Sequence, residues 1–320
     1  MANSFKILRR RLANEIEPGS FAVCTTTSAG TTTTLVSTDL ALTRGDTDAL
    51  DAGWAYWTSG SLLGHQRPVQ TNGLDTATGT VTTTPAWSAS APNTAEFEWH
   101  GRYPVKCGPG TPWVSGYLEM LNYSLPLVWF EDDISVSAVT SQTRYLLDIT
   151  THPWLADEPK RRVLDIMAPL ASDNVKRASG HRWRIDDDAE APALVFESGG
   201  YNTGETFYLR CARPAHTRIK ISGTWTDVTA AALNSSQFGL AADSDECHGP
   251  PQVILALAIT QAMNALGMRQ PDYQSDTWEA RRQYWATVAA ASKYTRLPRR
   301  NDGNQRLRAV GVTGGLMGVR

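Results

Sequence analysis

Apolar positions three or four residues apart predict a helix at the start of the chain. Residues 4–17 carry this stripe, with Ser4 or Asn3 available as a cap and Pro18-Gly19 behind it: Phe5, Leu8, Leu12 and Ile16. One face of this helix must pack on another part of the protein. Three further segments follow the same rule: residues 112–125 behind the cap Thr111, residues 253–266, and a segment from Asp276 to about Tyr294. Residues 253–266 are apolar on nearly every side, so we expect that helix to be buried.

Thr31 to Trp99 is a different kind of segment, in which short Thr, Val and aromatic runs are interrupted by Gly, Asn and Pro. β-Branched and aromatic residues favour strands, and Gly and Asn favour tight turns. We predict strands at Trp54–Thr58 and Thr80–Thr84, and turns at Asn72-Gly73 and Thr76–Gly79. The result expected is a small antiparallel β domain.

The strand pattern returns between Tyr145 and Thr229 and predicts a β-sandwich. The predicted strands are Tyr145–Thr150, Arg162–Ala168, His181–Ile185, Ala193–Glu197, Glu205–Cys211 and Arg218–Ser222. We interpret Gly199–Gly204 as a hairpin turn, because a phosphate-binding loop needs a helix behind it.

These elements predict an α+β fold that is mainly β. The expected division is an N-terminal helix (1–20), a Thr-rich antiparallel β domain (21–110), a helix (111–130), a β-sandwich (131–248), a helical region (249–295) and an extended basic tail (296–320). The tail has Gly and Arg without apolar periodicity, and tails of this kind often order only against a partner.

Charge is distributed unevenly although the net charge is only −2. Residues 1–17 and 269–320 are basic, and the body between them is acidic. One interpretation of this distribution is a solvated surface with loose termini. The other is that the oppositely charged parts make complementary contacts between copies or with a neighbouring protein. On the second interpretation we predict these arginines as interaction residues: Arg281, Arg282, Arg296, Arg299, Arg300, Arg306 and Arg308.

Candidate catalytic and metal-binding groups are scattered. The four cysteines never form a Cys-x-x-Cys pair, so we expect buried free thiols. The six histidines stand singly, and the acidic runs Glu131–Asp133 and Asp186–Asp188 are interpreted as solvated turns. Walker, dinucleotide-binding and Gly-x-Ser-x-Gly motifs are absent from the sequence, so we predict no catalytic residue, metal or cofactor.

Neither a membrane span nor a signal peptide is predicted, because no apolar run reaches about 18 residues and no apolar core follows the basic start. We therefore expect synthesis in the cytoplasm. The eleven tryptophans are spread along the chain, which favours core and interface positions. A stacking platform for glycans is the alternative, with Trp54 and Trp57 as its exposed residues.

The order of these segments resembles structural proteins of tailed-bacteriophage virions. The similarity lies in GTTTTLV, GWAYWTSG and GTVTTTPAW of the Thr-rich segment, in YLEMLNYSLPLVW, in HRWRIDD and GETFYLRCARP of the sandwich, and in the terminal helices. Within those proteins the chain is most similar to head-to-tail connector, or neck adaptor, proteins, many of which are shorter and mainly helical.

The resemblance implies a non-enzymatic protein of the virion, assembled in the host cytoplasm. It implies a homo-oligomeric ring, twelve-fold or six-fold, that contacts portal and tail proteins, with genomic DNA passing through it and no membrane contact. The acidic body suits a passage for DNA better than tight DNA binding. The alternative function is a tail-fibre, baseplate or receptor-binding protein that recognises host glycans, through Trp57 among others.

Overall fold

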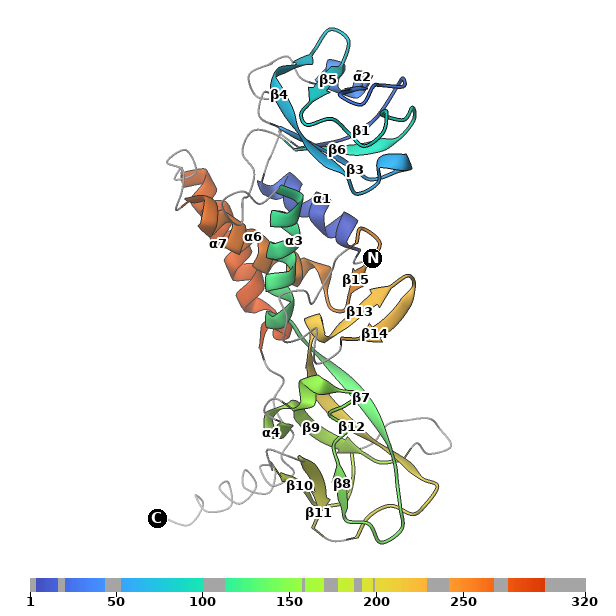
Figure 1. The fold of residues 1–320 in the computed structure, drawn as a ribbon. Coiled ribbons are helices and arrows are strands. Elements are labelled where there is room, and N and C mark those ends of the chain that lie inside the picture. Colours follow the sequence, from blue (N-terminus) through green and yellow to red (C-terminus); the bar gives the residue numbers. More distant parts are fainter. Residues whose placement is uncertain are drawn as a thin grey trace, which may run out of the picture. The chain divides into compact units, whose positions relative to one another are not determined.

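The structure is a computed structural model, and it describes residues 4–16, 21–43, 53–100, 113–156, 159–169, 178–186, 192–197, 199–228, 242–267 and 276–296. Its helices and strands are drawn in Figure 1. By its internal contacts the chain divides into two units. The first combines residues 1–125 with 240–291, and the second combines 126–239 with 292–320. The six-part division expected from the sequence stays a prediction.

An antiparallel six-stranded sheet forms the β part of the first unit, with strand order β1-β6-β3-β4-β5-β2. Its strands are β1 (Ala22–Thr25), β2 (Thr34–Val36), β3 (Trp54–Trp57), β4 (Gln66–Asp75), β5 (Thr80–Thr83) and β6 (Glu96–His100). A short helix, α2 (Thr38–Thr43), and a 3-10 turn, η1 (Gly60–Leu62), lie between strands. The predicted strands at Trp54–Thr58 and Thr80–Thr84 are confirmed.

Alternation along β3 and β6 sorts their side chains into two faces. Trp57 pairs with Phe97 and Ala55 with Trp99, and all four belong to the buried apolar core of this sheet. The opposite face carries Tyr56 and the even-numbered residues of β6, and Tyr56 pairs with Glu98. The polar residues of β6 therefore lie on the side away from the apolar core.

The turn predicted at Asn72-Gly73 is wrong, because β4 continues through both residues. Asn72 has φ 55°, and the pairing with β5 shifts register between Val69 and Leu74. A Cβ on Gly73 would lie 2.7 Å from the carbonyl oxygen of Thr82, so the backbones approach too closely for a side chain. The Asn-Gly signal marks a β-bulge, and the turn comes at Thr76–Gly79 as predicted.

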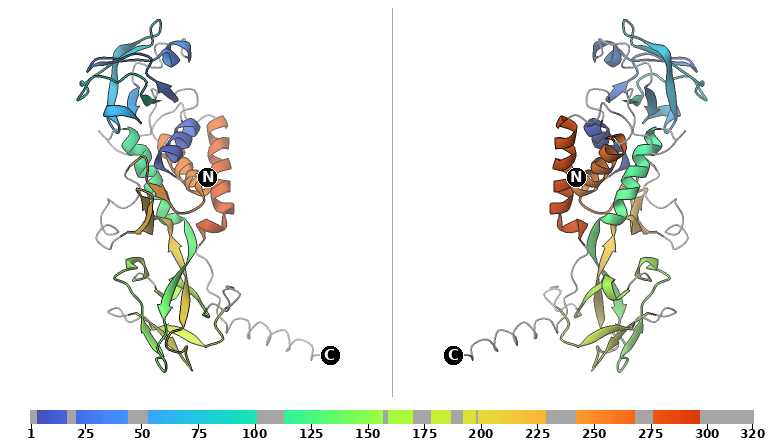
Figure 2. Two further views of the ribbon diagram at one scale, coloured as in Figure 1. Left: turned by 90° about the vertical axis from the view of Figure 1, so that its right-hand side faces the viewer. Right: turned by 90° about the vertical axis from the view of Figure 1, so that its left-hand side faces the viewer.

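The described residues of the first unit also form four long helices, which lie close together in Figures 1 and 2. They are α1 (Phe5–Ile16), α3 (Trp113–Ser124), α6 (Pro251–Gly267) and α7 (Asp276–Ala291), with the 3-10 turns η2 (Leu125–Leu127) and η6 (Lys293–Thr295) after α3 and α7. Helices α1, α3 and α6 and the start of α7 agree with the predictions. The predicted end of the last helix, at about Tyr294, is wrong, because α7 ends at Ala291. A two-residue strand, β15 (Glu246–Cys247), precedes α6.

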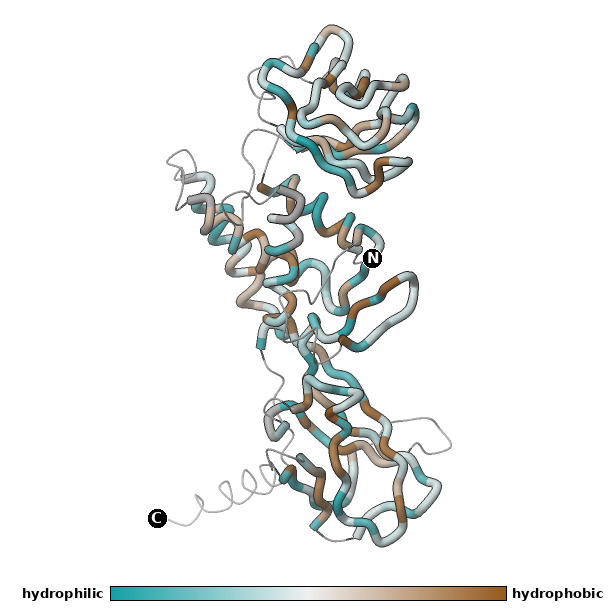
Figure 3. The backbone as a smooth tube through the Cα atoms, viewed as in Figure 1, coloured by the Kyte–Doolittle hydropathy of each residue, from teal (hydrophilic) through white to brown (hydrophobic). Residues whose placement is uncertain are grey.

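Helix α6 lies at the centre of this bundle and packs on each of the other three helices. Its side chains are buried on several sides, including Ile254, Ala258 and Met263, none of them measurably exposed. The hydrophobic stretch of α6 is visible along the tube in Figure 3. The predicted burial of this helix is confirmed.

Two three-stranded antiparallel sheets pack around one core in the second unit, with strand orders β7-β12-β9 and β10-β11-β8. The strands are β7 (Trp129–Ser137), β8 (Arg144–Leu146), β9 (Val163–Met167), β10 (Trp183–Asp186), β11 (Ala193–Phe196) and β12 (Thr206–Pro214). A hairpin of β13 (Arg218–Ile221) and β14 (Thr224–Asp227) follows. The short helix α4 (Pro159–Arg162) and the 3-10 turns η3 (Pro153–Leu155) and η4 (Ala215–Thr217) lie between strands.

Each predicted strand of this region overlaps an observed one, and the α+β fold with sandwich-like sheets is confirmed. Two local predictions are wrong. Gly199–Gly204 is not a hairpin turn, because β11 and β12 belong to different sheets. Glu131–Asp133 is not a solvated turn but the middle of β7, where the carboxylates meet arginines.

Candidate functional site

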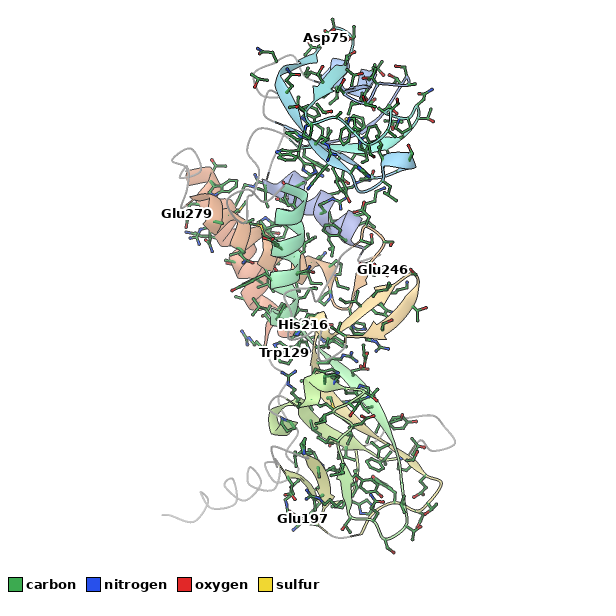
Figure 4. The ribbon with its side chains drawn as sticks, viewed as in Figure 1. Asp75, Trp129, Glu197, His216, Glu246 and Glu279 are labelled. Carbon is green, nitrogen blue, oxygen red and sulfur yellow. The ribbon has the colours of Figure 1, made fainter. Side chains whose placement is uncertain are left out.

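The three predicted interaction arginines that the structure describes lie at the end of the helical region, on α7 and just after η6. Arg281 donates from Nη2 to the carbonyl oxygen and to Oε2 of Glu15, both at 2.9 Å, and so links α7 to the end of α1. Arg282 donates from Nε to Glu279 at 2.7 Å and from Nη1 to Asn264 of α6 at 3.0 Å. Arg296 is exposed just after η6. Glu279 is labelled on α7 in Figure 4.

The bonds of Arg281 and Arg282 give both residues a packing role inside the unit. Both side chains remain about one-third exposed, at 33% and 32%, so a partner could still contact their outer edges. The other predicted interaction residues, Arg299, Arg300, Arg306 and Arg308, lie outside the described residues.

Trp57 is completely buried, and the prediction that it is an exposed glycan-stacking residue is wrong. Its ring packs edge-on against Trp87, with centroids 5.7 Å apart, and at a tilt against Phe97 at 5.6 Å. The reason is register: position 57 falls on the core face of β3, and Trp54 falls on the opposite face and is half-buried.

A buried ionic cluster on the other face of the same sheet joins α1 to β6. The Arg9 guanidinium donates to Glu98 from Nε at 2.8 Å and from Nη2 at 2.9 Å, and neither side chain is exposed. It also bonds Asp243, and its Cζ lies 4.5 Å from the ring centroid of Tyr56. Tyr56 donates its hydroxyl to Asp243 at 3.1 Å.

The rim of this cluster is more exposed and adds two cations. Lys6 donates to Glu96 at 2.5 Å, and Arg10 donates to Glu96 and Glu98, each at 2.7 Å. Thr58 also donates to Glu96, at 2.7 Å. Three positive side chains of α1 therefore face the two acidic residues of β6.

These contacts shift the pKa values of both acids. Burial disfavours the Glu98 carboxylate, but hydrogen bonds from His100 and Arg9 outweigh it and hold its pKa well below the usual range. Burial likewise opposes ionisation of Glu96, while Lys6, Thr58 and Arg10 lower its pKa to about 2. Burial raises the pKa of Tyr56 far above its ordinary value. Both glutamates are thus charged and matched by cations.

A second buried network lies in the other unit, centred on Arg213 of β12. Its side chain is 2% exposed and donates to Asp132 at 2.8 Å, to Asp227 at 2.6 Å and to Thr217 Oγ1 at 2.8 Å. Its Cζ lies 5.0 Å from the ring centroid of Trp154. The network ties β12 to β7 and β14.

Two histidines, His152 and His216, interact with residues of this network. His152 Nδ1 lies 3.0 Å from Asp227 Oδ2, and His152 and Arg213 together overcome burial to lower the pKa of Asp227 to about 2. Burial, with the positive charges of Arg162 and Arg213, lowers the pKa of His216 to about 4. His216 is therefore neutral at pH 7. In Figure 4 it lies close to Trp129, at the point where β12 ends against the start of β7.

Within the described ranges, no group of three or more His, Cys, Asp or Glu side chains could hold a metal ion. Cys24, Cys211 and Cys247 are buried thiols, as predicted, and burial raises the pKa of Cys247 to about 12. Cys107 and the acidic residues Asp187 and Asp188 lie outside the described residues. Asp186 pairs with Arg144 and Arg184 at the surface.

A cavity of about 240 Å³ opens between the two sheets of the second unit. Aliphatic residues of β7, β8, β11 and β12 line it, together with Asp148 and His152. Because His152 is bonded to Asp227, the polar end of the cavity is connected to the Arg213 network.

Sequence reasoning missed both ionic networks, although one signal was present. Arg9 lies four residues after Phe5 and one after Leu8, within the apolar stripe of α1, and a charged residue at such a position requires a buried partner. The partner, Glu98, is 89 residues away and could not be identified from spacing.

Comparison with known proteins adds no family: no protein-family model and no curated protein sequence matches this chain. In the part of the chain that the structure describes, no helix is long and apolar enough to cross a membrane.

Proposed function

We propose that this chain is a non-enzymatic structural protein of a tailed-bacteriophage virion, a head-to-tail connector or adaptor that joins the portal to the tail. In this proposal copies of the chain form a twelve-fold or six-fold ring, contact portal and tail proteins, and surround a passage for genomic DNA. The resemblance in segment order and in the quoted Thr-rich and Trp-containing segments carries the proposal.

The location of the buried charged residues supports a structural role. In enzymes such groups gather in a cleft with access to substrate. Here Arg9 and Glu98 are sealed between a helix and a sheet, and Arg213 is sealed between strands. These networks fix the elements of each unit to one another, which is what a rigid building block needs.

Exposed apolar side chains on both units support an assembly. Large ones occur on the helices, at Tyr123 (65% exposed) and Tyr284 (61%), and on the strands of the second unit, at Leu146 (66%) and Ile221 (51%). Aromatic and aliphatic residues of this kind form the centres of subunit contacts. The hydrophobic stretches of the β13–β14 hairpin are visible in Figure 3.

The glycan-binding alternative loses one of its two named residues, because Trp57 is buried, and the other, Trp54, is half-buried. A more exposed aromatic side chain for this alternative is Trp225 on β14, at 39%.

Electron microscopy of the virion with this protein labelled tests the proposed location. The label is expected at the head-tail junction. A label at the tail tip, together with glycan binding that is lost in Trp225→Ala, would support the alternative and overturn the connector.

A further inference from the structure

The cavity of the second unit lies where the edge strands of its two sheets come together. β7 is the edge of one sheet and β8 is the edge of the other, and both line the cavity. Edge strands present backbone donors and acceptors on their outer side, and natural proteins commonly cover such an edge. The groove between β7 and β8 is therefore a place where an extended segment can dock.

The lining of this groove suits aliphatic side chains. It is formed mainly by Ile134, Val136, Leu194 and Leu209, and Leu146 at its mouth is 66% exposed. At about 240 Å³ the cavity is below the usual size of a pocket for drug-sized ligands, which begins at about 300 Å³. It exceeds an apolar cavity of about 150 Å³ that can hold benzene, so one or two small aliphatic side chains fit.

The C-terminal segment starts beside β7, one of the two strands that border this groove. The turn η6 packs against β7, and the chain continues from Arg296 for 24 more residues. Ten residues in extended form span about 33 Å, and a nine-residue strand such as β7 is about 30 Å long. Residues from about 306 onward can therefore reach any point along β7.

The C-terminal segment is basic, and residues 126–239 of the second unit have a small excess of acidic residues. Residues 297–320 contain five arginines and one aspartate, whereas residues 126–239 contain 15 acidic and 12 basic residues. Arg308, Val310 and Val312 fall on one side of an extended chain because side chains alternate. Asp148 lines the polar end of the groove and is exposed.

We propose that residues 306–313 of the chain's own C-terminal segment dock in extended form in the groove between β7 and β8. Val310 and Val312 fill the aliphatic cavity, and Arg308 lies against Asp148. Docking in the same chain is favoured because a segment tethered beside its site has an effective concentration in the millimolar range. This proposal concerns the isolated chain and holds or fails independently of the connector function.

Hydrogen exchange tests the docking on the isolated full chain and on a chain that ends at Arg296. Amides of residues 134–137 and 145–147 are expected to exchange about tenfold faster in the shortened chain, because the covering segment is gone. The full-length variant Val310→Asp/Val312→Asp, which leaves every described residue intact, is expected to give the same increase. Equal exchange in all three proteins would overturn the proposal.

A groove variant and a matched control complete the test. Leu146→Lys in the full chain is expected to raise exchange as truncation does, since it adds a positive charge at the mouth of the groove. Ile221→Lys changes an exposed aliphatic residue of the same unit outside the groove and should leave exchange at 134–137 unchanged. Protection that grows with protein concentration would assign the segment to a second copy and overturn the intramolecular proposal.

Discussion

The guanidinium of Arg9 and the carboxylate of Glu98 form a two-bond pair, at 2.8 and 2.9 Å, with neither side chain exposed to solvent. The pair connects the first helix of the chain to a strand 89 residues later. Burying such charges is costly in itself, but removing one partner leaves the other charge buried and unpaired. The contact between α1 and the sheet therefore depends on both residues.

Replacement of Arg9 tests this dependence. Arg9→Met is expected to lower the free energy of unfolding by about 3–5 kcal/mol, since Glu98 and Asp243 lose their buried cation. Arg11→Met serves as the matched control, because Arg11 lies on the exposed side of the same helix. Urea denaturation measures the free energy of unfolding of the two variants. An equal loss in both would show that the buried pair contributes no more to stability than an exposed arginine does.

Acid titration tests the charges of β6. The folded-state pKa of Glu96 is about 2, below its ordinary 4.5, so its contribution to stability is present above about pH 4.5 and is lost as the pH falls toward 2. The pKa of Glu98 is lowered as well. Urea midpoints between pH 7 and about pH 3 should fall in the wild type and fall less steeply in Glu96→Gln. If the urea midpoint fell equally steeply with pH in Glu96→Gln and in the wild type, Glu96 would not contribute to the acid sensitivity of the fold.

Arg213 is expected to hold the second unit together in the same way. Arg213→Met removes the partner of Asp132 and Asp227 and should destabilise that unit by about 3–5 kcal/mol. Arg184→Met is the control, since Arg184 is 57% exposed and pairs with Asp186 at the surface, where such pairs contribute at most about 1 kcal/mol. Thermal unfolding of both variants provides the measurement.

Replacement of Trp57 tests whether this residue is part of the core. Trp57→Ala should destabilise the first unit by about 3–5 kcal/mol, because it empties a site packed by Trp87 and Phe97. Trp225→Ala, at an exposed position, is expected to change stability by less than about 0.5 kcal/mol. If Trp57→Ala left the unfolding midpoint unchanged, the assignment of Trp57 to the core would be wrong.

The elements of the fold could be predicted wherever a local pattern determined them. The stripe from Phe5 to Ile16 identified α1, and the continuous apolar run identified α6 and its burial. The turn prediction at Asn72-Gly73 is wrong because an Asn-Gly pair occurs in β-bulges as well as in turns. The pairing of β4 with β5 is needed to distinguish the two. The acidic run in β7 was mistaken for a turn because its arginine partners lie about 80 residues away.

The candidate sites were harder to predict because they depend on register and long-range contacts. Alternation places Trp54 and Trp57 on opposite faces but does not say which face is buried until β3 is paired with β6. Arg281 and Arg282 were identified as interaction residues from their charge, while their partners Glu15 and Asn264 are on other helices. Sequence alone could not show these bonds.

Co-sedimentation with portal rings tests the connector function most directly. Purified full-length chain is mixed with portal rings of the same virion, and the sedimented material is examined by electron microscopy. The account predicts that the chain sediments with the portal as an additional ring of matching symmetry. A chain that remains strictly monomeric and does not sediment with portal rings would contradict it.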